Sequence, residues 1–138
     1  RSVNENTRKL LQDQVRKIAE STAAAYELRS HVKIEYDTPP IVNPARPVNW
    51  SQEAVTSLLG EDALVPLDML NMGGEDFACY MEKIPGCFIR IGAREPGGEI
   101  IPAHSPKFHA AEESIFVGAA VLAETARVAS RAVAPPRK

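Results

Sequence analysis

The sequence is poor in several features that mark particular classes of protein. Its two cysteines, Cys79 and Cys87, are too few for a disulfide framework. No apolar run approaches ~18 residues, so the sequence predicts no transmembrane helix, and its first residues do not resemble a signal peptide. The net charge of −2 provides no basic surface for nucleic acid or for an anionic membrane. These absences predict a cytoplasmic protein with buried free thiols.

The remaining composition is that of a globular protein. With 138 residues, of which 44% are hydrophobic and 25% charged, the chain is long enough for one domain or for parts of two. Prolines gather between residues 39 and 47, where they interrupt helices and central strands. We therefore expect a linker at 38–50. It would separate residues 1–37 from a domain at 51–131, which a tail at 132–138 would follow.

Helical periodicity predicts two long helices. The first spans residues 5 to about 26 and can be capped by Asn4 or Asn6. The last is expected from Glu112 to about Ser130, with two glutamates in its first turn, where negative charge favours the helix dipole. The expected apolar faces are Leu11, Val15, Ile18, Thr22 and Ala25 in the first helix, and Ile115, Ala119, Leu122, Ala126 and Ala129 in the last.

Shorter elements are expected between these two helices. One helix would be capped by Ser51 and stopped by Gly60, and a short amphipathic helix would start near Phe77. Three strands are expected, at residues 31–36, 64–67 and 87–91, and residues 1–3 would end a further strand before the first helix. Because these strands alternate with helices, the fold class predicted for the second part is α/β, and the first part would be a β-α-β unit.

Two loops carry the residues of chemical interest. Gly73-Gly74-Glu75-Asp76-Phe77 joins a diglycine, which allows close approach of a ligand to the backbone, to two carboxylates suited to the start of a helix. His104 lies in the proline-flanked loop Ala103-His104-Ser105-Pro106-Lys107-Phe108. Taken singly, each motif is also typical of an ordinary loop. The other two histidines, His31 and His109, are expected on the surface.

The order of these parts resembles the C-terminal end of a known family. Gly-Gly-Glu-Asp-Phe-Ala is followed by a Tyr-containing helix, then Pro-Gly-Cys-Phe, Ile-Gly-Ala, His-Ser-Pro-x-Phe, Glu-Glu and an Ala-rich helix. The chain is similar in this to the metal-dependent amidohydrolases that include aminoacylases, hippurate hydrolases and indole-acetyl-amino-acid hydrolases, with carboxypeptidase G-type peptidases as relatives. The similarity extends from Arg1 to about Arg131 and is strongest over 73–122.

The resemblance implies that the chain is the C-terminal part of a longer enzyme. Residues 1–37 would end a small α+β lid or dimerisation domain that forms a homodimer. Residues 51–131 would complete a two- or three-layered α/β catalytic domain. The parent would hydrolyse the amide bond of N-acyl amino acids or small peptides with a water activated by two metal ions, zinc first and manganese or another metal second. The fragment alone would be inactive, because the general base and the other ligands lie upstream.

The same resemblance implies roles for the two loops. His104 would bind a metal through its neutral imidazole. Gly73 and Gly74 would let the backbone approach the substrate carboxylate, with Gly74 in place of the family's usual serine. Glu75 and Asp76 would support the metal ligands by hydrogen bonds, although a helix-start role explains both carboxylates equally well.

Arg1 would bind the substrate's free carboxylate, a task that suits a guanidinium fork. The competing interpretation is a chain-end arginine without a role. Glu112-Glu113 follows His104 on the last helix, so this pair is not equated with the family's catalytic glutamates.

Two other classes of function stay open. The chain can be a non-catalytic dimerisation or binding module that retains the scaffold and pairs its strand at 31–36 edge to edge with a partner. It can also be a non-enzymatic relative that holds peptides without cutting them. Metal content separates the first of these alternatives from the hydrolase, because an assembly module need bind no metal.

Overall fold

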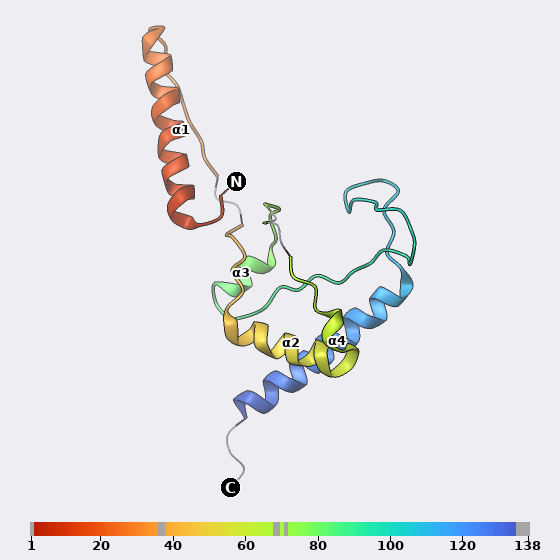
Figure 1. The fold of residues 1–138 in the computed structure, drawn as a ribbon. Helices are drawn as coiled ribbons and strands as arrows, with labels where there is room; N and C mark the ends of the chain where they lie inside the picture. Colours follow the sequence, from red (N-terminus) through yellow and green to blue (C-terminus); the bar gives the residue numbers. More distant parts are fainter. Residues whose placement is uncertain (1, 36–37, 68–69, 71, 135–138) are drawn as a thin grey trace. The chain divides into compact units, whose positions relative to one another are not determined.

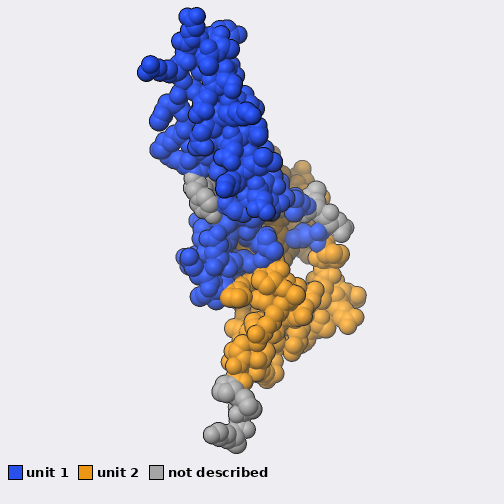
Figure 2. All heavy atoms as spheres, turned by 90° about the vertical axis from the view of Figure 1, so that its left-hand side faces the viewer, with its two compact units in different colours: residues 1–42, 67–84 blue, residues 43–66, 85–138 orange. Residues whose placement is uncertain are grey.

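A computed structural model describes residues 2–35, 38–67, 70 and 72–134. The chain divides into two compact units, which Figure 2 shows in different colours. Unit 1 comprises residues 1–42 and 67–84, and unit 2 comprises residues 43–66 and 85–138.

Unit 1 contains the long helix α1, which runs from Glu5 to Ala25 (Figure 1). The Asn4 side chain accepts a hydrogen bond from the backbone N–H of Thr7 at 2.8 Å, which makes Asn4 the N-cap. The predicted helix is therefore confirmed, with the first of its two possible caps. No residue of α1 is buried. Its expected apolar face is largely open to solvent, with Leu11 46%, Val15 53% and Ile18 63% exposed.

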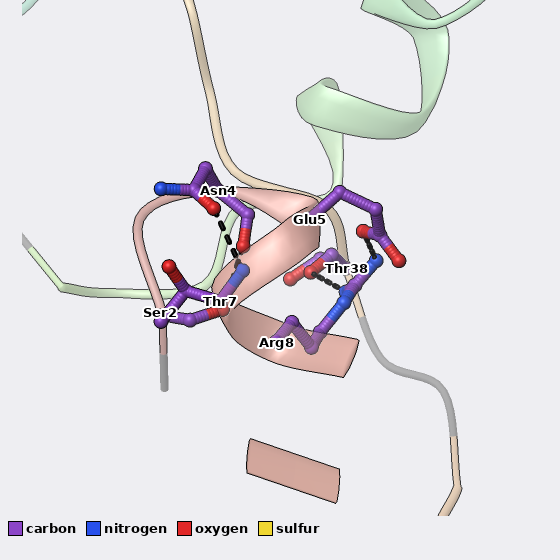
Figure 3. A network of polar contacts seen from close by, with 6 residues as sticks. All are labelled: Ser2, Asn4, Glu5, Thr7, Arg8 and Thr38. Atoms are coloured by element: carbon purple, nitrogen blue, oxygen red, sulfur yellow. Dashed lines mark hydrogen bonds and ion pairs between the residues drawn. The ribbon is translucent and has the colours of Figure 1, made fainter. Parts of the chain in front are cut away.

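The chain reverses after α1 and returns to the start of the helix. Glu27 adopts a φ of 57° at the reversal, and residues 28–35 then follow α1 back (Figure 1). At the end of this path the backbone oxygen of Thr38 accepts a hydrogen bond from Arg8 Nη1 at 3.2 Å. Arg8 also pairs with Glu5, so one guanidinium joins the first turn of α1 to the returning chain (Figure 3).

Residues 31–35 keep the predicted alternation but do not form the predicted strand. Val32 and Ile34 are half-buried, whereas the residues between and beside them are exposed. Lys33 and Glu35 form an ion pair on the exposed side, as residues two apart on an extended chain can. Among the described residues no neighbouring backbone pairs with this segment, and a strand requires such a partner. The last residue of the predicted strand lies outside the described part of the chain.

Unit 1 also contains the short helix α3, Phe77–Met81. Phe77 and Tyr80 place their ring centroids 6.5 Å apart. Phe77 and Met81 are half-buried, but Tyr80 and Ile84 are 70% and 71% exposed. The predicted short helix is therefore confirmed, and only part of its apolar face is covered.

Unit 2 is built on α2, Ala45–Leu59, and α4, Glu112–Val133, which pack against each other (Figure 1). The 3-10 helix η1, Glu61–Ala63, follows α2 and contacts it. The most deeply buried residues on the two helices are Ala54 of α2, with no exposed surface, and Val121 of α4, which is 1% exposed. The other residues buried within these helices are Pro47, Ser51 and Val128. Small buried side chains on α2 allow the two backbones to approach closely.

Helix α2 begins well before the predicted cap at Ser51, so that prediction is wrong. Pro47 lies in its first turn, where backbone N–H groups have no partner within the helix and proline costs little. Ser51 is buried, and its hydroxyl donates a hydrogen bond to the Pro47 oxygen at 3.1 Å. The predicted stop at Gly60 is confirmed, with φ at 88°.

Helix α4 begins at Glu112 as predicted, but its buried face was wrongly predicted. Ile115 and Leu122, from the expected face, are 69% and 65% exposed, whereas Val121 and Val128 are buried. Successive helical residues are about 100° apart around the axis, so α4 carries two neighbouring apolar stripes. The position of Gly118 fits the buried stripe, because a Cβ added there would lie 3.7 Å from Ile91 Cγ1.

The predicted strands at 64–67 and 87–91 are also wrong. The Asn43 side chain donates from Nδ2 to the Phe88 oxygen and accepts from the Phe88 N–H, both at 2.9 Å. One amide thus occupies both backbone groups that Phe88 would offer to a neighbouring strand. Residues 64–67 are exposed, and Val65 reaches 79%. The described residues therefore form helices and connections, without the predicted α/β layers.

Both cysteines are free, but the expectation that both are buried is wrong. Cys79 is exposed and Cys87 is half-buried. Within the described ranges, every helix is too short or too polar to cross a membrane.

Candidate functional site

The diglycine loop lies in unit 1, directly before α3. Gly73 and Gly74 are exposed. Glu75 is half-buried and accepts a hydrogen bond from the Phe77 N–H at 3.4 Å, while Asp76 is exposed and makes no capping bond. The carboxylate that serves the start of α3 is therefore that of Glu75, in agreement with the helix-start interpretation of this residue.

Gly74 is held against Thr38, from the segment that returns along α1. A Cβ added to Gly74 would lie 3.0 Å from Thr38 Oγ1, which is closer than ordinary van der Waals contact. Positive φ, the other reason for glycine, is found among the described glycines only at Gly60 and Gly97. The absence of a side chain at position 74 therefore serves close approach.

His104 is carried by a loop of unit 2 whose ends are joined. The Ala111 N–H donates to the Ala93 oxygen at 2.9 Å, which closes the loop just before α4. Within the loop, the Ser105 N–H donates to the Pro102 oxygen at 2.9 Å. His104 therefore occupies the third position of a hydrogen-bonded β-turn.

A second turn follows at once and fixes the chain after His104. The Phe108 N–H donates to the Ser105 oxygen at 3.0 Å, and the Ser105 hydroxyl accepts from the Lys107 N–H at 3.2 Å. Pro106 occupies the second position of this turn, which proline favours. Two consecutive turns thus define the backbone on which His104 presents an exposed imidazole.

His109 is exposed too, as predicted, but it lies differently. Its Nδ1 is 3.4 Å from the backbone oxygen of Lys107, within hydrogen-bond distance. The imidazole of His104 makes no hydrogen bond or ion pair with any other described residue. Of these two neighbouring histidines, His104 has the more available pair of ring nitrogens.

A complete metal site is not present in the described part of the chain. Among those residues no group of three or more His, Cys, Asp or Glu side chains lies close enough to hold an ion. Catalytic zinc takes about three protein ligands. One exposed imidazole fits a single ligand position of such a site.

The predicted site residues are thus distributed over both units. The four residues from Gly73 to Asp76 lie together in unit 1, and His104 lies in unit 2. Arg1 lies outside the described residues, so its predicted role stays a prediction. Sequence reasoning missed Thr38, because it contacts Gly74 in space but lies far from it in the sequence, and no local motif predicts that contact.

Comparison with known proteins shows which family the chain is related to. Residues 3–128 match the pattern of Peptidase family M20/M25/M40. An IAA-amino acid hydrolase ILR1-like 6 of Arabidopsis thaliana is 44% identical over 89 residues, which are 64% of this chain and 19% of the relative. Thermostable carboxypeptidase 2 of Saccharolobus solfataricus is 33% identical over 122 residues, 86% of this chain and 30% of the relative.

An N-acetylcysteine deacetylase of Bacillus subtilis is 32% identical over 126 residues, 91% of this chain and 31% of the relative. The chain belongs to Peptidase family M20/M25/M40, and the predicted amidohydrolase resemblance is confirmed. Membership implies an α/β peptidase fold. The chain spans less than a third of the length of each of these relatives.

Proposed function

We propose that this chain is the C-terminal part of a metal-dependent amidohydrolase that cleaves N-acyl amino acids or small peptides. The observation that carries the proposal is the family match over residues 3–128. The relatives named above include a hydrolase of amino-acid conjugates, a carboxypeptidase and a deacetylase of an N-acetyl amino acid. The reaction common to these names is hydrolysis of an amide bond next to an amino acid.

His104 is the residue of this chain that we propose as a metal ligand. Its imidazole is exposed on two consecutive turns, and a neutral ring nitrogen is a good donor to zinc or manganese. Two bound ions, zinc first among the candidates, would lower the pKa of a bound water and polarise the amide oxygen. Their other ligands and the general base would come from residues outside this chain, so the chain alone is expected to be inactive.

The diglycine loop is the second proposed part of the site. The exposed Gly73 and Gly74 would line the substrate pocket and Arg1 would bind the substrate's carboxylate. Glu75 and Asp76 would lie behind the metal ligands. Glu75 already accepts a backbone hydrogen bond, so Asp76 is the freer of the two for that task.

The proposed domain organisation keeps the boundaries predicted above. Residues 1–37 would end a lid domain that forms a homodimer, 38–50 would be the crossover, and 51–131 would complete the α/β catalytic domain before a tail at 132–138. Cytoplasmic location belongs to this proposal. We also propose that the protein binds neither nucleic acid nor membranes, because a net charge of −2 gives no basic surface for either.

A non-catalytic assembly module is the second candidate function. The observation that favours it is the apolar surface of α1, which is exposed along most of its length. Apolar surface of this kind marks a place where another protein surface can pack. This candidate requires neither metal nor hydrolysis.

Two measurements separate the candidates. The first reads the in-frame DNA upstream of the codon for Arg1. The second assays purified full-length protein against a panel of N-acetyl and longer N-acyl amino acids, with and without a chelator. The hydrolase proposal expects upstream His, Asp and Glu ligands and chelator-sensitive release of the free amino acid. A metal-free protein that dimerises and releases no amino acid would replace it with the assembly module.

A further inference from the structure

Among the described residues, Thr38 Oγ1 is the atom found within 4 Å of the place where a Cβ of residue 74 would lie. This oxygen lies 3.0 Å from that point. The exposed diglycine has no side chains of its own. The hydroxyl of Thr38 therefore lies beside the exposed diglycine backbone, in contact with the place where a side chain of residue 74 would begin.

The position of Thr38 is fixed by its neighbours. Its backbone oxygen accepts a hydrogen bond from Arg8 at 3.2 Å, and the Arg8 side chain is only 16% exposed (Figure 3). Pro39, the next residue, is buried. Threonine is β-branched, so few χ1 rotamers are open to it. The backbone that carries the hydroxyl is thus held at the carbonyl of Thr38 and at the buried Pro39.

The same hydroxyl is free to serve a ligand. Thr38 is half-buried, and within the described residues its Oγ1 makes no hydrogen bond. A hydroxyl carries one donor and can accept as well. Its half-exposed position beside an exposed backbone is that of a polar group that orients a bound molecule.

The charges around the loop favour a neutral group over a carboxylate. Glu75 and Asp76 follow the diglycine directly, and the nearby cation Arg8 is already paired with Glu5. Like charges close together repel, so an anionic substrate group is disfavoured beside two carboxylates. An amide or acyl carbonyl carries no charge and accepts a hydrogen bond from a hydroxyl.

We propose that Thr38 is a further substrate-contacting residue, whose hydroxyl lies against Gly74 and donates a hydrogen bond to the acyl-amide end of the substrate rather than to its carboxylate. This inference rests on the proposed function. It assigns the acyl-amide end of the N-acyl amino acid to the diglycine loop, in place of the substrate carboxylate that the family resemblance implied there. Arg8 acts as a positioning residue, because its guanidinium holds the Thr38 backbone.

The contact itself is tested by unfolding this chain. Gly74→Ala is expected to lower the midpoint of thermal unfolding by a few degrees, because its Cβ would press on Thr38 Oγ1. In a Thr38→Ala background the same change is expected to cost much less. Strictly additive shifts would overturn the contact, because residues that touch do not act independently.

The role is tested in the full-length enzyme with Thr38→Val and its control Thr38→Ser. Valine keeps the shape and removes the hydroxyl, whereas serine keeps the hydroxyl. Thr38→Val is expected to raise KM about tenfold with kcat within about twofold, and Thr38→Ser is expected to stay near the unsubstituted enzyme. An unchanged KM in an active Thr38→Val enzyme overturns the inference and leaves the proposed hydrolase intact.

A change in the substrate decides which end the hydroxyl contacts. Each variant is assayed with an N-acetyl amino acid and with its carboxamide analogue, which lacks the charged carboxylate. The expected result is the same fold-effect of Thr38→Val on both substrates. Loss of the effect with the carboxamide assigns the hydroxyl to the carboxylate and overturns the inference. If unsubstituted full-length protein hydrolyses neither substrate, the proposed function and this inference fail together.

Discussion

Helices α1 and α4 are nearly equal in length, with 21 and 22 residues, but they are stabilised in different ways. Helix α4 packs on α2 and buries Val121 and Val128. Helix α1 buries no residue. Its stabilisation is local, from the Asn4 cap and from ion pairs three residues apart, Glu5 with Arg8 and Asp13 with Arg16. An apolar stripe therefore makes a helix amphipathic, but a partner decides whether the stripe becomes core.

The largest expected effect distinguishes the two stripes of α4. Val121→Asp places an unpaired charge between α2 and α4 and is expected to lower the free energy of unfolding by roughly 3–5 kcal/mol. The matched control is Leu122→Asp, one residue further along and 65% exposed, with an expected loss below about 1 kcal/mol. Denaturant unfolding followed by circular dichroism measures both. Equal losses would mean that the buried stripe of α4 is not the one seen here.

The next largest effect concerns the local stabilisation of α1. Asn4→Ala removes the side-chain acceptor for the Thr7 N–H and is expected to cost about 1 kcal/mol of helix stability. Asn6→Ala, at an exposed position inside the helix, is the control and is expected to change little. Amide exchange in the first turn of α1 reports the difference. If Asn6→Ala loosens that turn as much as Asn4→Ala, the cap has been placed at the wrong residue.

The third prediction concerns Asn43, whose side chain bonds the Phe88 backbone in place of a neighbouring strand. Its removal is expected to cost as much stability as loss of the Asn4 cap, or less. Asn43→Ala removes both hydrogen bonds to the Phe88 backbone and is expected to cost about 1 kcal/mol, because both bonds compete with water. Exchange of the Phe88 amide is expected to speed up. Asn49→Ala, an exposed change within α2, serves as the control. Unchanged protection of the Phe88 amide in Asn43→Ala would show that another group holds this segment.

The smallest effect is a pH dependence on the surface of α4. The side-chain hydrogen bond from Arg127 lowers the pKa of Glu124, and the attraction between their charges lowers it further. Between the folded and unfolded pKa values the unfolded chain binds more protons. The stabilisation is therefore complete above the unfolded pKa of Glu124 and is lost as pH falls through its folded pKa.

Glu124→Gln tests this pH dependence, because glutamine cannot ionise. The unfolding midpoint of the unsubstituted chain is expected to exceed that of Glu124→Gln near neutral pH. The gap is expected to close as pH falls below the range where glutamate titrates, about pH 4. A gap that stays constant down to low pH would mean that the ion pair contributes nothing to folding.

The features that sequence could predict are local ones. The start of α4 at Glu112 and the stop at Gly60 each depend on residues within one turn, and both were predicted. The cap at Asn4 is also local, and it was one of the two caps predicted for α1. The choice between the two stripes of α4 depends on α2 and Ile91, which periodicity does not contain. The predicted strands needed backbone neighbours that the described residues lack. At Phe88 a distant side chain occupies the pairing groups instead.

In the candidate site, too, the local features could be predicted from the sequence and the contacts between distant residues could not. The two loops were found from their motifs, because a glycine pair and a proline-flanked turn can each be recognised from adjacent residues in the sequence. The contact between Thr38 and Gly74 joins segments far apart in the chain, so no motif reveals it. The metal ligands other than His104 were assigned by resemblance to regions upstream, so their assignment stays a prediction.

The most direct test of the proposed hydrolase is the metal content of full-length protein with His104→Ala, beside His109→Ala as the control. Both histidines are exposed and lie in the same loop between Ala93 and Ala111, so neither substitution removes a buried side chain. We expect His104→Ala to lose bound metal and hydrolysis of N-acyl amino acids, and His109→Ala to keep both. Full metal occupancy and an unchanged rate in His104→Ala would contradict the assignment of this loop to a metal centre.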